Sequence, residues 1–302
     1  MPLEDLAVLT PEKAALRDKM VHWYDVAAGL VFNKHTCALG WKDFTPSTAE
    51  GCADYHAVFP LLDLMSMASS PWAHEDFYKS ALWTASHDRL GGARVLVSGL
   101  ATPSMAQIVL DATDPDVKVD VLDVCPTPLL TCQKVLQPGQ VERMKFIQRD
   151  ALVFDGEGVQ YDAITTDAFL TRFPENERLK VLQKWVKMLK PEGRVVTTWR
   201  IGERQGRKGY GGADDQRIFM ENLEERVRHW GIPMRTFLEM QTIFGLAKEY
   251  AEKMHSYSGQ TVEQIKTFME QCFGDVRIEE SGWVYDVTMR RYARIIAYDP
   301  KK

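Results

Sequence analysis

The sequence lacks the patterns that would mark a membrane, secreted or zinc-binding protein. No apolar run approaches the roughly 18 residues that a membrane-spanning helix requires, and the first twenty residues are polar, without the apolar stretch of a secretory signal. The five cysteines include no C-x-x-C pair, and the seven histidines show neither H-x-x-x-H nor H-E-x-x-H spacing. We therefore expect a cytoplasmic protein with reduced thiols, no membrane partner and no metal site.

An excess of positive charge is also missing. The chain carries 37 Lys and Arg against 42 Asp and Glu, a formal net charge of -5. A protein that mainly grips nucleic acid needs clustered basic side chains to neutralise phosphates. With 302 residues, 45% of them hydrophobic, the chain can bury a large core without disulfides or metals. We expect a small-molecule substrate, no nucleic-acid partner, and a monomer or homodimer.

Short apolar segments alternate with helical segments in the middle of the chain. The apolar segments predict strands at residues 94–100, 118–124, 144–150, 161–167 and 194–200. Amphipathic helices are predicted between them, most clearly at 175–190, where an apolar stripe is formed by Leu179, Leu182, Trp185, Val186 and Leu189 before Pro191 and Gly193 end the helix. This order predicts an α/β fold in which helices cover both faces of a mostly parallel sheet.

The N-terminal part is predicted to be a helical cap. Thr10 is a suitable N-cap and Pro11 a suitable first residue for a helix that runs to about Leu30. Residues 31–90 are rich in aromatic, methionine and histidine side chains, and helical stretches there alternate with Gly and Pro. We assign residues 1–90 to this cap.

The C-terminal part is predicted to add helices and a closing hairpin. A glycine-rich segment at 202–215 precedes two helical patterns, at 214–230 and 235–256, and a capping box at Thr261 begins a third helix. Two strands are expected at 276–287 and 291–300, around a turn at 288–290. The predicted division is therefore a core at 91–201 and 261–302, interrupted by a lid loop and helical insertion at 202–260.

Acidic residues end three successive predicted strands. Asp123, Asp150 and Asp167 follow the second, third and fourth apolar segments. In an open parallel sheet, ligands bind beyond the carboxyl ends of the strands. Aspartate also ends strands and caps helices for structural reasons, but its recurrence at one edge favours a binding site.

Residues 94–200 resemble the core of the class I S-adenosylmethionine-dependent methyltransferases, a Rossmann-like family. The most specific block is residues 150–200, in which a strand, a loop, Pro174, an amphipathic helix, the sequence Leu-Lys-Pro-Glu-Gly and a further strand follow in the family's order. The resemblance implies a seven-stranded, mostly parallel sheet with a terminal antiparallel hairpin, and S-adenosylmethionine as cofactor.

The resemblance also implies a set of cofactor-binding residues. Asp123, followed by Val124, matches the carboxylate that holds the ribose, Asp150 with Ala151 matches the adenine contact, and Asp167 with Phe169 matches the loop near the sulfonium. Gly99 and Ala101 belong to the turn after the first strand. The cofactor-binding set is thus Gly99, Ala101, Asp123, Val124, Asp150, Ala151, Asp167 and Phe169.

The stretch RVLVSGLATPSMA departs from the family at this turn. Val97 stands where the family has an acidic residue, and Ala101 and Pro103 replace two of its three glycines. A carboxylate partner for the methionine ammonium is thereby lost, and proline removes one amide donor. We therefore expect the amino-acid half of the cofactor to be held by the N-terminal cap.

Three side chains are assigned catalytic roles. Tyr24 lies in a Tyr-Asp pair similar to that of the leading helix in several family members, where the tyrosine helps to enclose the cofactor; simple packing of this ring is an equal alternative. Asp167 would face the reacting end. Arg200 could bind a substrate carboxylate or pair with a neighbouring acid.

The function expected from this resemblance is methyl transfer to a small molecule, and two alternatives stay open. Because the residues that would bind the methionine half of the cofactor differ from the family's, the aminocarboxypropyl arm could react instead, with release of methylthioadenosine. Loss of the glycines is also compatible with a non-catalytic subunit that kept the fold. The cofactor-derived product and a binding titration distinguish the three.

Overall fold

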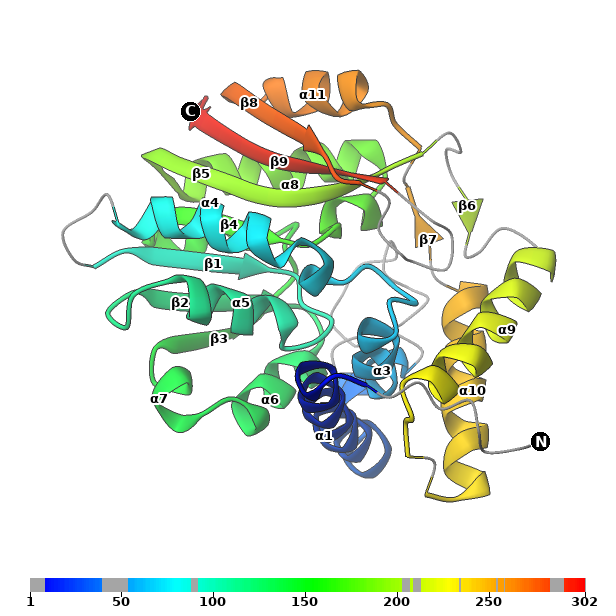
Figure 1. Ribbon diagram of the computed structural model, residues 1–302. Coiled ribbons are helices and arrows are strands. Elements are labelled where there is room, and N and C mark those ends of the chain that lie inside the picture. The colour runs from blue at the N-terminus through cyan, green and yellow to red at the C-terminus, as the bar shows by residue number, and fades with distance from the viewer. Residues whose placement is uncertain are drawn as a thin grey trace.

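A computed structural model gives the architecture of residues 9–39, 54–87, 92–202, 207–208, 213–233, 235–253, 255–257, 259–282 and 291–301. Its centre is a seven-stranded sheet with strand order β3-β2-β1-β4-β5-β9-β8, in which β9 is antiparallel to both of its neighbours (Figure 1). The strands are β1 (Arg94–Ser98), β2 (Lys118–Asp123), β3 (Met144–Gln148), β4 (Tyr161–Thr166), β5 (Leu189–Ile201), β8 (Phe273–Glu280) and β9 (Arg291–Pro300). The predicted seven-stranded, mostly parallel sheet with a terminal antiparallel hairpin is confirmed.

The strand predictions differ from the structure mainly at the edges of elements. The first closing strand begins at Phe273, before the expected start at 276, and ends at Glu280; residues 283–287 of the expected range 276–287 lie outside the described residues. The predicted turn at 288–290 lies outside the described residues. β5 begins at Leu189, five residues before its predicted start, because Leu189 is already in extended conformation (φ -77°, ψ 145°).

Helices cover both faces of the sheet, because successive apolar side chains of the central strands point to opposite faces. Val95 and Val97 of β1 face the helices α4 (Glu75–His87), α5 (Ser104–Ala112) and α6 (Pro126–Val135). Leu96, between them, joins the opposite core with residues of α8 (Glu175–Met188) and α11 (Val262–Glu270). Each face of the central strand is thus apolar, as expected for a parallel sheet buried on both sides.

A separate helical layer lies beyond the carboxyl ends of the central strands (Figure 1). It combines α1 (Pro11–Lys34) and α3 (Phe59–Leu64) from the N-terminal part with α9 (Ala213–His229) and α10 (Phe237–Lys253) from the insertion. One hydrophobic cluster joins them, including Trp23, Leu61, Phe219 and Ala247. The helical layer therefore unites two segments that are far apart in the sequence.

Helix α4 falls within the segment assigned to the cap, yet it packs on the sheet. Its Tyr78, Ala81 and Leu82 belong to the core on the α5 face. Because α4 is part of the sheet's cover, we restrict the proposed cap to the elements before it. Of the lid loop proposed at 202–215, most residues lie outside the described part of the chain.

Short elements complete the chain. These are α2 (Thr36–Leu39), η3 (Tyr55–Ala57), η4 (Pro71–His74), α7 (Pro138–Val141), η5 (Gly156–Gly158), η6 (Phe169–Arg172), β6 (Arg207–Lys208) and β7 (His255–Ser256), the last two forming a small antiparallel pair. No helix in the described ranges is long and apolar enough to cross a bilayer.

Helix ends follow local chemistry. The Thr10 side chain accepts a hydrogen bond from the Lys13 amide at the start of α1, and Thr261 forms the predicted capping box with Gln264. Helix α1 continues past the expected Leu30 to Lys34, where His35 ends it in the left-handed conformation (φ 51°).

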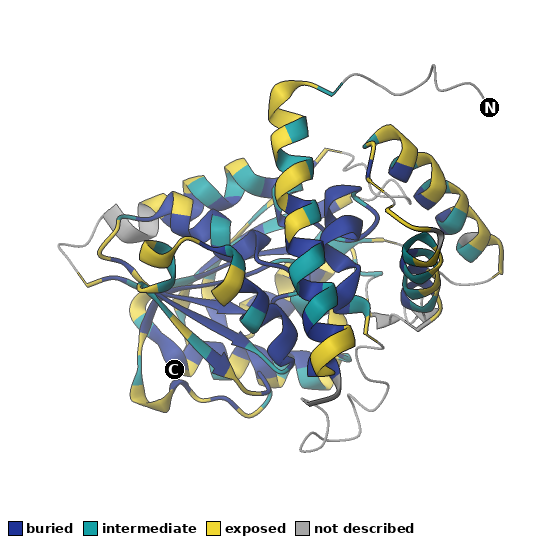
Figure 2. Ribbon diagram, turned by 90° about the horizontal axis from the view of Figure 1, so that it is seen from below, coloured by how far each residue is buried: buried dark blue, intermediate teal, exposed yellow. Residues whose placement is uncertain are grey.

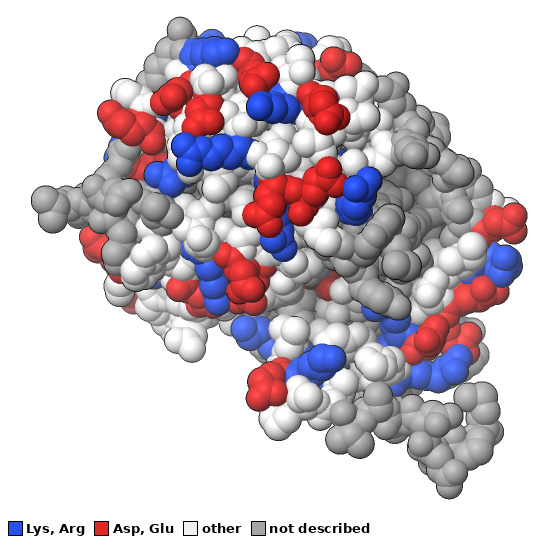
Figure 3. All heavy atoms as spheres, turned by 45° about the horizontal axis from the view of Figure 1, so that its top comes forward, with Lys and Arg blue, Asp and Glu red and all other residues white. Residues whose placement is uncertain are grey.

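Burial and charge follow the layered arrangement. The central strands β1 and β4 are almost wholly buried between their helices, whereas α9 and α10 expose their outer sides (Figure 2). Acidic and basic side chains are interspersed over the face seen in Figure 3. Several form i,i+4 pairs along helices, such as Arg217 with Glu221 and Arg228 with Glu224.

Candidate functional site

The candidate site lies where the strand order reverses, at the carboxyl ends of β1, β2 and β4. The chain proceeds from β1 to β2 and β3 on one side, and then crosses to β4 on the other side of β1. This reversal separates the loops after β1 and β4, which in open α/β sheets creates a ligand crevice. The turn that joins β1 to α5, residues 99–103 with the first helical residue Ser104, is therefore the centre of the site.

Gly99 opens this turn in a conformation that favours glycine. Its φ is +81°, and its amide donates a hydrogen bond of 2.8 Å to the carbonyl of Leu122. A Cβ added at Gly99 would lie 2.3 Å from Cδ2 of Phe169. The structure thus brings the two predicted residues together, and the glycine allows the Phe169 ring to approach the backbone.

Asp123 ties the turn to the end of β2. One carboxylate oxygen accepts from the Leu100 amide and the other from the Cys125 amide, each at 2.7 Å. Asp123 is therefore fixed in orientation by two backbone donors.

Asp150 organises the loop after β3, the strand next to β2. Its Oδ1 accepts from the Leu152 amide at 2.8 Å, and its carbonyl accepts from the amides of Val153 and Phe154. Ala151 is buried in the core beneath this loop, and Val124 lies between Asp123 and the Cys125 amide. Asp123 and Asp150 thus occupy the tips of adjacent strands, as predicted.

The Asp63 carboxylate comes from α3 of the helical layer and was not anticipated from the sequence. Its Oδ2 accepts from the hydroxyls of Thr102, at 2.8 Å, and Ser104, at 2.5 Å, both in the turn after β1. Its Oδ1 is buried without a hydrogen-bond partner among the described residues, and the whole residue is 1% exposed.

Burial raises the pKa of Asp63 to about 6, from 3.8. The hydroxyl groups act in the opposite direction, and the charge of Asp167 adds to the increase. A carboxylate in this position carries a desolvation cost that neutral donors offset only in part.

Asp167 lies at the centre of a polar cluster between β4 and β5. Its Oδ1 accepts from the hydroxyls of Tyr78, at 2.9 Å, and Thr198, at 2.6 Å, and its Oδ2 accepts from Ser69 at 2.5 Å. Ala168, in left-handed conformation with φ 48°, donates its amide to the Thr198 hydroxyl. Burial, and then the Asp167 charge, raise the pKa of the Tyr78 hydroxyl well above its usual value.

Arg200 extends this polar cluster along β5. Its Nε donates to the Tyr292 hydroxyl at 3.1 Å, across the β5–β9 ladder. The Tyr292 ring in turn meets His74 edge to face, with centroids 4.9 Å apart. Burial lowers the pKa of His74, whose Nδ1 accepts a 3.4 Å hydrogen bond from Arg294 and whose charged form Asp167 favours.

Tyr24 is buried in the helical layer. Its hydroxyl is hydrogen-bonded to Glu239 of α10, beside the ion pair of Arg235 with Asp25 at 2.6 Å. Burial, followed by the charges of Glu239 and Asp25, raises the pKa of Tyr24. These contacts join α1 to α10, so the side chain serves at least to hold the two parts of the layer together.

Two of the remaining predicted positions are accounted for by packing. Val97 is fully buried in the apolar core against α4 and α5, so the end of β1 offers no polar group at the family's acidic position. Ala101 packs against the hydrophobic cluster of the helical layer. Pro103 is the N-cap of α5 and accepts the Gln107 amide at its carbonyl.

The carboxylates of the site differ from those at the opposite, amino ends of the strands. There, Asp120 is paired with Arg94 and Asp162 with Lys190, both at 2.8 Å. Within the described ranges, Asp63 and Asp167 form no ion pair with Lys or Arg; their hydrogen-bond donors are hydroxyl groups. The carboxyl ends of the strands therefore bring together two negative side chains, Asp63 buried and Asp167 half-buried, whose charge a cationic ligand would compensate.

Comparison with known proteins gives likeness of fold only. No protein-family model matches the chain, and none of the curated proteins does. Similar solved structures include the N-methyltransferase NodS from Bradyrhizobium japonicum with S-adenosylhomocysteine, at 15% identity and a TM-score of 0.45 over 81% of this chain and 99% of that one.

Two further solved structures show a similarly low sequence identity. Human N-acetylserotonin methyltransferase with S-adenosylmethionine is 13% identical with a TM-score of 0.49, covering 86% of this chain and 60% of that one. A possible exported protein from Bordetella parapertussis is 14% identical with a TM-score of 0.48, covering 97% and 100%. The fold is that of the class I methyltransferases. The strand order and the antiparallel β9, rather than close superposition, establish this.

Proposed function

We propose that the protein binds S-adenosylmethionine at the turn after β1 and transfers its methyl group to a small molecule. The observation that carries the proposal is the uncompensated negative charge of Asp63 and Asp167 around this turn. S-adenosylmethionine brings two positive groups, an ammonium and a sulfonium. A site with one buried and one half-buried carboxylate and neutral donors suits such a ligand better than it suits an anionic one.

The residues present fit the parts of this cofactor. Asp123, oriented by two backbone amides, would accept hydrogen bonds from the ribose hydroxyls. The loop at Asp150 and Ala151 would contact the adenine. The buried, unpartnered Oδ1 of Asp63 would accept the methionine ammonium, and Asp63 thus replaces the acidic residue that is missing at Val97.

This role for Asp63 agrees with the expectation that the cap supplies the missing partner. The turn lacks two of the family's glycines, but the hydroxyls of Thr102 and Ser104 hold the Asp63 carboxylate at the N-terminus of α5. The amide dipoles of a helix N-terminus favour negative charge. Asp63 is therefore oriented by the same turn that would bind the cofactor.

The acceptor is proposed to lie beside Asp167 and Arg200. Asp167 is fixed by three hydroxyl donors, and Arg200 offers a guanidinium that could bind an anionic group of the acceptor. S-adenosylmethionine supplies an activated methyl group, so the chain has to bind, align and exclude water rather than supply strong acid–base catalysis. The helical layer, with Tyr24 between α1 and α10, would provide the exclusion.

Titration calorimetry with S-adenosylmethionine tests the proposal, followed by mass spectrometry of the cofactor-derived product in the presence of small-molecule extract. Saturable binding and S-adenosylhomocysteine as product are expected. Absence of heat at millimolar cofactor would refute the proposal and favour a non-catalytic, methyltransferase-like subunit.

Val97, at the position of the family's acidic residue, also favours a second candidate reaction. Because Val97 replaces the usual carboxylate, the methionine half has a different partner from the family's, and its aminocarboxypropyl arm could be the part that reacts. Methylthioadenosine as the product, with or without an acceptor, would replace methyl transfer by this chemistry.

A further inference from the structure

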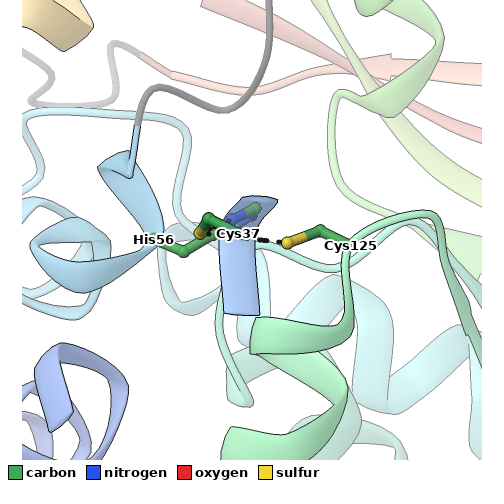
Figure 4. Close-up of side chains that lie close together, drawn as sticks. All are labelled: Cys37, His56 and Cys125. Carbon is green, nitrogen blue, oxygen red and sulfur yellow. Dashed lines mark hydrogen bonds between the residues drawn. The ribbon is translucent and has the colours of Figure 1, made fainter. Parts of the chain in front are cut away.

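A cluster of metal-ligating side chains lies outside the cofactor crevice described above. Cys37 of α2, His56 of η3 and Cys125, the N-cap of α6, point toward one another (Figure 4). All three residues are buried, and their ligand atoms lie within 4.8 Å of one another. In the sequence they are 19 and 69 residues apart, so no local spacing reveals them.

The distances between the donor atoms suit a tetrahedral zinc ion. With Zn–S near 2.3 Å and Zn–N near 2.0–2.1 Å, two ligands of such an ion are separated by about 3.8 Å for S···S and about 3.6 Å for S···N. Here the two sulfurs of Cys37 and Cys125 are 3.9 Å apart, and Cys37 Sγ is 3.5 Å from His56 Nδ1. The third distance, from Cys125 Sγ to the His56 ring nitrogen, is at most 4.8 Å, so reaching about 3.6 Å requires a shift of at most about 1.2 Å.

Hydrogen bonding among the three groups does not account for their convergence. A thiol is a weak donor and a weak acceptor, and bringing two thiols and an imidazole to one buried point gains little from such bonds. Thiolate and imidazole ligands are the set that borderline-soft divalent ions prefer. The expectation of no metal site was based on local spacing, whereas the fold assembles these ligands from three elements.

The surroundings of the cluster also suit a metal centre. The Thr127 hydroxyl lies 3.2 Å from Cys37 Sγ and 2.7 Å from the Thr36 hydroxyl, so it can donate to a Cys37 thiolate while Thr36 donates to it. Hydrogen bonds of this kind orient metal ligands and tune their basicity. Val31 and Ala57 complete an apolar enclosure.

We propose that Cys37, His56 and Cys125 bind one zinc ion, with a water molecule or other small ligand in the fourth position. Because α2 and η3 precede the sheet and Cys125 follows β2, the ion joins the N-terminal cap to the α/β core. The Cys125 amide also donates to Asp123, so this connection ends at the cofactor crevice. Nothing in this proposal depends on the reaction that the crevice performs.

Metal titration of the chelator-treated, reduced full-length protein tests the proposal directly. We expect one zinc ion per chain in competition with a chromophoric chelator, and release of about two protons per ion at neutral pH as the thiols ionise. Cobalt(II) in place of zinc should give thiolate-to-metal charge-transfer absorption and the intense visible bands of a tetrahedral site. Zinc should raise the melting temperature.

Single substitutions locate the ion. Cys37→Ser, Cys125→Ser and His56→Ala should each weaken zinc binding by at least about 100-fold, and the two serine variants should each lose part of the cobalt charge-transfer absorption. The matched control is Cys272→Ser, since Cys272 is also a buried thiol but packs with α11 on the other face of the sheet. It should bind zinc as the parent does.

Three results would overturn the proposal. The first is substoichiometric zinc in the folded, reduced parent protein, with folding verified by circular dichroism. The second is a cobalt spectrum without thiolate charge transfer, or one that Cys37→Ser and Cys125→Ser leave unchanged. The third is a Cys37–Cys125 disulfide, detected by peptide mass spectrometry after alkylation, in protein isolated under reducing conditions.

Discussion

Replacing Asp63 by Asn should make the protein more stable and its cofactor binding weaker. The substitution keeps the shape of the side chain, and its amide oxygen can take the place of Oδ2 as acceptor for Thr102 and Ser104. It removes a buried charge that no basic residue in the described part of the chain neutralises. Opposite effects on stability and on binding are the signature of a group kept for function.

The magnitude follows from the pKa of Asp63. An increase from 3.8 to about 6 corresponds to about 3 kcal/mol by which ionised Asp63 lowers the stability of the folded protein above pH 6. The Asn side chain places an NH2 group where Oδ1 has no partner, which costs about 1 kcal/mol. The net gain at pH 7.5 is therefore about 2 kcal/mol, or several degrees in melting temperature.

The pH dependence has a definite sign. Because the folded state binds a proton more tightly than the unfolded state, wild-type stability falls, through this group, as the pH rises from 3.8 to about 6. At pH 4.5 Asp63 is largely protonated in the folded protein. Most of the advantage of Asp63→Asn should therefore disappear there.

Urea unfolding at pH 7.5 and 4.5 measures the stability difference, and calorimetry measures the affinity for S-adenosylmethionine. If Oδ1 accepts the ammonium, the Asn variant should bind about 10- to 100-fold more weakly, as for loss of a charge-assisted hydrogen bond. Asp162→Asn is the matched control: Asp162 is equally buried but paired with Lys190, so its substitution should destabilise at pH 7.5.

Two outcomes would refute this reasoning separately. An Asp63→Asn variant that is no more stable at pH 7.5 than at pH 4.5, relative to wild type, would show that Asp63 is not an uncompensated buried charge. A variant that gains stability while binding S-adenosylmethionine with unchanged affinity would show that Asp63 does not contact the ammonium.

Three further substitutions probe the site and its support. Asp123→Ala should weaken S-adenosylmethionine binding by about 100-fold in calorimetry, because about 3 kcal/mol of charge-assisted hydrogen bonds to the ribose is lost; unchanged affinity would place the ribose elsewhere. Gly99→Ala should destabilise by at least about 2 kcal/mol in urea unfolding, since φ is +81° and the new Cβ would meet the Phe169 ring at 2.3 Å. Adding Phe169→Ala should cost less in this variant than in wild type, and strict additivity would exclude the clash. Arg178→Met should destabilise by about 3 kcal/mol, because the buried guanidinium donates to the carbonyls of Leu170, Phe173 and Tyr257 and stacks on Trp199 at 4.6 Å; an unchanged urea midpoint would mean that water replaces these donors.

The sheet could be predicted because its determinants are local. Runs such as RVLVSGL and YDAITTD combine β-branched residues with a length that fits one strand. An aspartate that directly follows such a run in the sequence must therefore lie at the end of the strand. Asp123 and Asp150 consequently lie at adjacent strand tips, as expected. The C-terminal end of the helix predicted at 175–190 was wrong, because α8 ends at Met188. The residue before a proline, here Pro191, is disfavoured in the helical conformation.

The missing parts of the site depend on contacts between distant segments. Asp63 is one acidic residue in an apolar helix, and nothing nearby shows that it meets Thr102 and Ser104, about 40 residues later. The same holds for Cys37, His56 and Cys125. A usable signal did exist in the turn itself, since the hydroxyl residues Thr102 and Ser104 flank Pro103 where the strand end lacks a carboxylate. Hydroxyl groups at these positions can hold a carboxylate from another segment.

Two of the contacts between the N-terminal cap and the core reach opposite sides of the same turn. Asp63 contacts the turn at Thr102 and Ser104, and the Cys37–His56–Cys125 cluster reaches Asp123, whose other oxygen accepts the Leu100 amide. A single displacement of the cap would therefore remove Asp63, the proposed partner of the ammonium, and loosen Asp123, the proposed partner of the ribose. Because ligands that bind only the docked state stabilise it, S-adenosylmethionine and zinc should each slow hydrogen exchange in the segment 54–70. The Cys125→Ser variant should abolish this protection by zinc and keep it for the cofactor, which separates the metal connection from the carboxylate connection.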